Sequence, residues 1–235
     1  MQVTPSDFAT LYLAARKLPP ARHNAQLDEQ LSPGYPLCLY RFADGRRLIC
    51  LCPELEEALP ALDALEEGAE FDRLWAFLFE GGPAYRKEEV TGFYLPDAPA
   101  PAADPRIRPL RRGDGPALHA LGRLSAREWA AGRVRVYDPH CFGLFDQGSG
   151  LVAVAGAQTL GRLGDISVFV HPEHRNNGLG GLVVRALCSA LYREGLTPLY
   201  RAENANKASC ALARRLGFAS GFAMTGAEAL WNAQT

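Results

Sequence analysis

The apolar and polar residues after residue 106 predict strands and helices in alternation. Helices are indicated where apolar residues recur at steps of three and four, and strands where short apolar runs end at turn residues such as those of 146–150. Gly195 and Gly217 end two of these helices, as is common at helix C-termini. The predicted strands are 107–110, 142–145, 151–157, 165–170 and 198–202, and the predicted helices are 115–124, 178–193 and 207–216.

The residues before 96 predict a smaller α+β module. Two strands within 37–52 are joined at Asp44-Gly45, a dipeptide typical of hairpin turns. Helices are predicted at 6–17, 55–65 and 71–79. The charged run 85–89 is interpreted as solvated surface. No motif in this half indicates a chemistry.

The two halves are separated by 95–105, where four prolines alternate with small residues. This composition is typical of an extended, semi-rigid linker. We therefore expect a small α+β domain at 1–95, a Pro/Ala linker at 96–105 and a second domain at 106–235.

Composition and charge exclude several classes of function. The chain has 235 residues, of which 48% are hydrophobic and 22% charged, as in folded globular proteins. Its 26 acidic and 25 basic residues nearly cancel, so we expect no nucleic-acid partner. No segment approaches the roughly 18 apolar residues of a membrane span, and no leader is visible, so we expect a cytoplasmic protein that does not bind membranes.

The six cysteines are scattered along the chain, which predicts reduced thiols rather than a disulfide framework. Cys50 and Cys52 stand two residues apart. Alternation on a strand explains this spacing, and no second pair stands at zinc spacing, so no metal is expected.

The most informative segment is 167–184, where a strand leads through a short turn into a helix. The first residues of this helix include Gly178, Gly180 and Gly181. A helix start offers backbone N–H groups without intrahelical partners, and the helix dipole adds positive potential, so a pyrophosphate fits there. Arg175 adds a permanent charge. A tight turn is the simpler alternative, whereas a P-loop is excluded because Gly180 is not followed by Lys and Ser or Thr.

These residues resemble the GNAT (N-acetyltransferase) superfamily. The run 175–180 is similar to its signature Q/R-x-x-G-x-G/A, and 170–175 to its Val-x-Pro-Glu-x-Arg lead-in. Asn206 followed by Leu-Gly-Phe at 216–218 is similar to the family's second helix. The resemblance covers about residues 106–222. It implies a mixed, mostly antiparallel sheet flanked by helices, here preceded by the small α+β domain.

The resemblance also implies acetyl-CoA, or a related acyl-CoA, as co-substrate and a primary amine as acceptor. The central strand would pair with the pantetheine arm, and the helix start would hold the pyrophosphate. The start of the second helix would approach the distal part of CoA or the thioester. For Asn206, a role as helix N-cap is equally open. The implied cofactor residues are Val168, Phe169, Val170, Arg175, Asn176, Asn177, Gly178, Leu179, Gly180, Gly181, Asn206 and Ser209.

In such enzymes the amine attacks the thioester directly, and a group on the protein accepts a proton. Asp165 and Glu203 are the candidate bases. Alternation places Asp165 on the sheet face opposite Val168 unless a bulge intervenes. Many members of the family carry a tyrosine as acid where this chain has Ala213.

The sequence leaves several alternatives open. The acceptor is not identified, because acceptor pockets in this fold come from variable loops such as 125–140. A non-catalytic acyl-CoA-binding protein is the alternative to an enzyme. Residues 1–95 are alternatively an interaction module for a protein partner, and a homodimer stays open.

Overall fold

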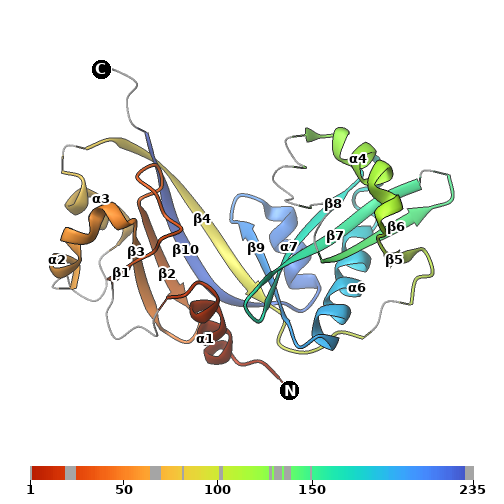
Figure 1. Cartoon of the computed structure of the whole chain (residues 1–235), viewed down its shortest axis with the longest axis horizontal. Coiled ribbons are helices and arrows are strands. Elements are labelled where there is room, and N and C mark those ends of the chain that lie inside the picture. The colour runs from red at the N-terminus through yellow and green to blue at the C-terminus, as the bar shows by residue number, and fades with distance from the viewer. Residues whose placement is uncertain are drawn as a thin grey trace. The chain divides into compact units, whose positions relative to one another are not determined.

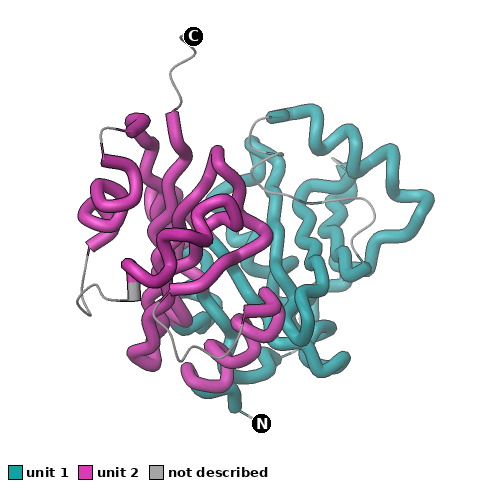
Figure 2. Tube along the Cα trace, turned by 60° about the vertical axis from the view of Figure 1, so that its left-hand side comes forward, with its two compact units in different colours: residues 1–4, 93–201, 211–219 teal, residues 5–92, 202–210, 220–235 magenta. Residues whose placement is uncertain are grey.

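The computed structural model describes residues 2–18, 25–63, 70–80, 82–100, 103–126, 129, 134, 139–148 and 150–230. The chain forms two compact units, each built from several stretches of sequence (Figure 2). Unit 1 comprises Met1–Thr4, Phe93–Arg201 and Ala211–Ala219. Unit 2 comprises Pro5–Gly92, Ala202–Cys210 and Ser220–Thr235.

Unit 1 is built on a mixed, mostly antiparallel sheet with the strand order β5-β6-β7-β8-β9 (Figure 1). Neighbouring strands from β5 to β8 pair antiparallel, and β8 pairs with β9 in parallel. This arrangement confirms the predicted fold class. The strands are β5 (Ile107–Pro109), β6 (His140–Asp146), β7 (Gly150–Leu160), β8 (Leu163–Val170) and β9 (Thr197–Glu203), the last of which ends in unit 2.

Helices α4 (Gly115–Arg123) and α6 (Leu179–Arg193) cover opposite faces of this sheet. Leu118 of α4 packs in one cluster with Phe169 of β8. A β-carbon added to Gly164, which faces the other side of β8, would lie 2.7 Å from Leu191 of α6. Alternation along β8 thus assigns one face to each helix. Unit 1 also contains the short 3₁₀ helices η2 (Arg112–Asp114) and η3 (Pro172–His174) and the end of α7 (Lys207–Arg215).

Unit 2 has a sheet with the strand order β1-β3-β2-β10-β4. Its strands are β1 (Ala25–Leu27), β2 (Leu37–Phe42), β3 (Arg47–Leu51) and most of β4 (Ala84–Tyr94) and β10 (Ala219–Leu230). Its helices are α1 (Pro5–Ala15), the 3₁₀ helix η1 (Pro53–Ala58), α2 (Leu59–Asp63) and α3 (Phe71–Leu78). One face of the sheet packs on α3 through Leu74 and Trp75, and the other carries aromatic rings that meet Phe8 and Tyr12 of α1.

The C-terminal strand β10 is part of the core of unit 2. It pairs antiparallel with β2, from Phe222 opposite Phe42 to Ala227 opposite Leu37. A β-carbon on Gly221 would lie only 2.1 Å from the ring of Phe8, so this glycine lets α1 approach the strand. The sheet of the N-terminal half therefore depends on residues from the far end of the chain.

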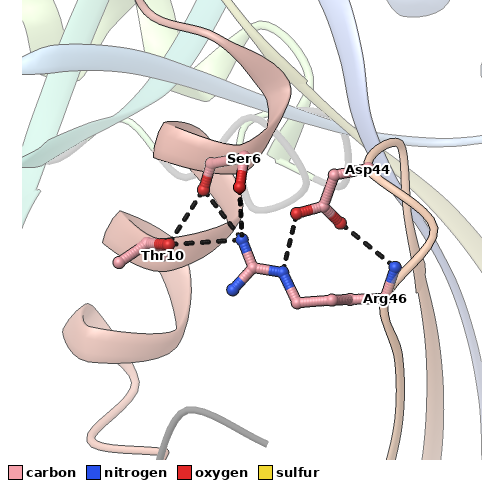
Figure 3. Close-up of polar contacts among 4 residues, drawn as sticks. All are labelled: Ser6, Thr10, Asp44 and Arg46. Carbon is pink, nitrogen blue, oxygen red and sulfur yellow. Dashed lines mark hydrogen bonds and ion pairs between the residues drawn. The ribbon is translucent and has the colours of Figure 1, made fainter.

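A polar network fixes α1 to the β2–β3 hairpin (Figure 3). Arg46 donates from Nη2 to the backbone oxygen of Ser6 at 2.8 Å and to Oγ1 of Thr10 at 3.2 Å. Its Nε donates to Asp44 at 2.6 Å, which orients the guanidinium toward the helix. The predicted hairpin is confirmed, and Gly45 at its turn has a φ of +90°.

Most predicted elements are confirmed, with three strands missed. The strands absent from the prediction are β1, β4 and β10. The run 85–89 lies in β4, where Arg86, Lys87 and Glu89 are exposed. The predicted helix 55–65 begins within η1 and continues as α2, and its last residues lie outside the described part.

The described part of the predicted linker is attached to unit 1. The N–H of Leu95 donates to Pro198 at 3.2 Å, and its carbonyl accepts a hydrogen bond from the Tyr192 hydroxyl. The carbonyl of Pro96 accepts from the N–H of Val3 at 2.9 Å. The division into independent domains at 96–105 stays a prediction, but the compact units follow other limits, because β10 belongs with unit 2.

Candidate functional site

Strand β8 has one edge that β9 covers only in part. Parallel pairing between these strands runs from Leu163 and Thr197 to Ile166 and Tyr200 and then ends. β8 continues to Val170, and along its whole length the other edge pairs with β7 without a register shift. The residues after Ile166 therefore present backbone groups to a gap beside β8.

The alternation of the antiparallel ladder decides which peptide groups face this gap. The N–H of His171 donates to the carbonyl of Val152 at 2.8 Å, so Phe169, two residues earlier, is also in a hydrogen-bonded pair with β7. Val168 and Val170 then direct their N–H and C=O groups to the gap. Val168, Phe169 and Val170 are predicted to meet the pantetheine arm, and of these, Val168 and Val170 direct their peptide groups to the gap beside β8.

The turn after β8 leads into α6 through a series of unpaired donors. In the described part of the chain, the backbone N–H groups of 176–180 donate to no group. The first helical bonds run from Gly181 and Leu182 to the carbonyl of Gly178, at 3.0 and 3.2 Å. Asn176 and Gly178 have φ values of +63° and +76°. Five successive donors at the positive end of a helix suit an anion.

The three glycines of this turn differ in what surrounds them. A β-carbon on Gly178 would meet no atom within 4 Å, so its positive φ is the constraint. A β-carbon on Gly180 would lie 3.2 Å from Cγ2 of Val170, and one on Gly181 would lie 3.7 Å from Leu212. Gly180 thus serves the close packing of α6 on β8.

Arg175 lies between the end of β8 and the start of α6. Its side chain is exposed, and its Nε donates to the carbonyl of Val170 at 3.4 Å. The neighbouring histidines belong to the turn itself: Nδ1 of His171 accepts the N–H of Glu173 at 3.2 Å, and its ring packs edge-on against His174. Arg175 is therefore the permanent cation of this turn.

Asp165 lies in an ion pair with Arg201 of β9. Nε of Arg201 donates to Oδ1 of Asp165 at 3.2 Å, and Nη2 donates to Oδ2. The unbroken register of β8 keeps Asp165 on the face opposite Val168, as alternation predicts. Arg201 is absent from the predicted site. The opposite charges of the two strands were the only signal, because their register is not visible in the sequence.

The other three predicted residues, Glu203, Asn206 and Ser209, belong to unit 2. The side chain of Glu203 is exposed. Oδ1 of Asn206 accepts the N–H of Ser209 at 3.0 Å, so the N-cap role of Asn206 is confirmed. A contact of these residues with CoA stays a prediction.

The two cysteines of the helical segments differ in what surrounds their thiols. Burial raises the pKa of the Cys188 thiol, which is 1% exposed. The Cys210 thiol donates to the carbonyl of Glu203 at 3.6 Å. A buried thiol whose pKa is raised is a poor nucleophile, because the thiolate is the reactive form.

Most of the predicted acceptor loop 125–140 lies outside the described residues. Among the residues that are described, no group of three or more His, Cys, Asp or Glu side chains is placed to hold a metal ion. No helix in the described ranges is long and apolar enough to cross a membrane.

Residues 141–225 match the family described as FR47-like protein. None of the curated proteins compared with the sequence matches it. Among solved structures, a GNAT-family protein from Novosphingobium aromaticivorans is 24% identical, with a TM-score of 0.53, and the match covers 62% of this chain and 67% of that one.

An acetyltransferase of the GNAT family from Colwellia psychrerythraea is 16% identical, with a TM-score of 0.54, over 80% of this chain and 79% of that one. A Drosophila protein is 19% identical, with a TM-score of 0.52, over 84% of this chain and 74% of that one. At these identities the structures establish a shared fold. The fold that the resemblance implies is thereby confirmed.

Proposed function

We propose, from the GNAT fold that this chain carries, that it is an N-acyltransferase that transfers an acetyl or other acyl group from acyl-CoA to a primary amine. The observation that carries the proposal is the juxtaposition of two features in unit 1. The gap-facing edge of β8 at Val168 and Val170 leads, through one turn, into the unpaired N–H groups of 176–180.

Each part of acyl-CoA has a chemical counterpart on this segment. Pantetheine carries amide groups that can pair with the gap-facing edge of β8 as an added strand would. The pyrophosphate fits the unpaired N–H groups, with Arg175 adding a charge. Asn206 and Ser209 are proposed to approach the distal part of CoA or its thioester. A gap-facing N–H such as that of Val168 is suited to stabilise the oxyanion that forms when the amine attacks.

We propose Glu203 as the group that accepts the proton of the amine, since its carboxylate is exposed. The second candidate, Asp165, is already in an ion pair with Arg201. Transfer is proposed to be direct, without an acyl-enzyme, because burial raises the pKa of the Cys188 thiol and the Cys210 thiol donates a hydrogen bond. The six free cysteines support a cytoplasmic location.

A second candidate function is acyl-CoA binding without catalysis. It is favoured by Ala213, which is fully buried where many family members have the tyrosine that serves as acid. The leaving thiolate is weakly basic, so the loss of this acid does not by itself exclude transfer.

The test has three measurements on the full chain. Calorimetry measures CoA binding, a thiol reagent follows release of CoA from acetyl-CoA in the presence of an amine library, and intact mass follows the protein after mixing with acetyl-CoA alone. We expect binding, amine-dependent thiol release and no adduct. Binding without release for any amine would establish the second candidate, and absence of binding would refute both.

A further inference from the structure

The ion pair between Asp165 and Arg201 spans the place where β8 and β9 separate. The last parallel pair is Ile166 opposite Tyr200. Asp165 lies one residue before this pair on β8, and Arg201 lies one residue after it on β9. Because Leu199 is opposite Asp165, and Arg201 follows Leu199 by two residues, both charged side chains lie on the same face of the sheet.

The geometry of the pair is that of a two-point attachment. Both carboxylate oxygens of Asp165 accept a hydrogen bond from the guanidinium of Arg201. The exposed fractions of the two side chains are only 19% and 30%. A partly buried, bidentate Arg–carboxylate pair is stronger and more directional than an exposed ion pair.

We infer that this ion pair is a clamp that fixes the point at which β8 and β9 part, and that Asp165 is therefore a positioning residue rather than the proton acceptor. The inference rests on the proposed function. If the clamp is lost, pairing between the strands can extend or fray by one residue. Either change alters the gap into which Val168 and Val170 direct their peptide groups.

A role as general base fits this carboxylate poorly. Protonation of Asp165 during each turnover would break a bidentate pair with a permanently charged group. The face on which Asp165 lies is also opposite the one on which Val168 and Val170 pack beneath α6. The clamp requires neither proton transfer nor contact with substrate.

If the ion pair is a clamp, breaking it should weaken only the part of the CoA affinity that comes from the pantetheine arm. Asp165→Asn and Arg201→Gln should weaken CoA binding about tenfold, within the range of couplings between contacting residues. Adenosine 3′-phosphate 5′-diphosphate lacks the pantetheine arm and requires only the turn before α6, so its affinity should stay within about twofold of the parent. Asp114→Asn, which breaks the bidentate pair with Arg108 of the same unit, is the matched control and should leave both affinities unchanged.

The double variant Asp165→Arg with Arg201→Asp separates a clamp from a base. It restores an ion pair with reversed polarity, so a clamp predicts recovery of CoA affinity and of kcat. If Asp165 is the base, kcat stays low even though CoA binds. If the single variants unfold, Arg201→Lys keeps the charge without the two parallel hydrogen bonds, and it should weaken CoA but not the nucleotide.

Two results would overturn the clamp. One is CoA affinity in both single variants, or in Arg201→Lys, equal to that of the parent. The other is an equal loss for CoA and for the nucleotide, which indicates general damage to the unit. A parent protein that does not bind CoA at all contradicts the proposed function instead.

Discussion

Replacing Gly178 with valine should weaken CoA binding about tenfold or more, while unit 1 loses about 1–3 kcal/mol of stability and stays folded. Gly178 precedes α6 with a φ of +76°, and a β-carbon there meets no atom within 4 Å. The cost in the folded protein is therefore backbone strain, about 1–3 kcal/mol for a residue other than glycine held in this region. Valine is among the residues least tolerant of it.

The same strain also affects CoA binding, because it acts on the backbone N–H groups that are proposed to hold the pyrophosphate. If valine leaves the left-handed region, the N–H groups of 178 and 179 turn away from their present directions. A hydrogen bond to a charged group contributes about 1.5–3 kcal/mol, so losing even one raises the Kd of CoA about tenfold or more. Calorimetry measures the affinity, and urea unfolding measures the free energy of unfolding.

Gly45→Val is the matched control. Gly45 has a φ of +90° in the β2–β3 hairpin, and a β-carbon on it also meets no atom within 4 Å. The two variants should lose similar stability, but only Gly178→Val should lose affinity for CoA. CoA affinity of Gly178→Val within twofold of the parent would refute the placement of the phosphates. An equal loss in Gly45→Val would show that the effect comes from destabilisation alone.

Two further predictions concern stability. Asp28 is 2% exposed and ion-paired with Arg16. Asp28→Asn leaves the buried charge of Arg16 without its partner, so it should lower the free energy of unfolding by about 3–5 kcal/mol in urea titrations. Asp72→Asn, which removes an exposed ion pair with Lys87, is the control and should cost less than about 1 kcal/mol. A protein beginning at Pro105 retains β10 but lacks β2, the strand with which β10 pairs, so it should aggregate or bind CoA weakly. A monodisperse fragment that binds CoA like the full chain would contradict this prediction and favour a division at 96–105.

The elements that follow from the sequence are those whose signals are local. The hairpin at Asp44-Gly45 is specified by the backbone freedom of its own turn, and Gly45 has the expected positive φ. Helix α6 is specified by its own apolar stripe and by Gly195, whose φ is +74°. These signals need no knowledge of the rest of the fold.

The sequence does not predict β10, because some of its residues are required by packing against residues far away in the chain. It contains Gly221 and Gly226, which ordinarily weaken a strand. In the structure they make room for Phe8 and for Tyr35, whose hydroxyl would lie 2.1 Å from a β-carbon on Gly226. Such a requirement becomes visible only once the partners are known.

The candidate site divides in the same way. The turn after β8 and the start of α6 could be predicted, because the glycines and the arginine of 175–181 form a contiguous motif. The ion pair of Asp165 with Arg201 could not be predicted, because it depends on the register between two strands that α6 separates in the sequence. Register is set by the whole sheet rather than by either strand.

The two parts of the proposed cofactor site, the edge of β8 and the start of α6, are in direct contact through Val170 and Gly180. Val170 directs its peptide group to the gap beside β8, while its side chain packs beneath the first turn of α6. Gly180 permits this contact, since a β-carbon there would already lie 3.2 Å from Cγ2 of Val170. A larger residue at 180 must therefore move the helix start away from β8, or move Val170. Either shift displaces the N–H groups of the turn relative to the strand edge, so Gly180 holds the two parts at a fixed spacing even where its own N–H touches no ligand.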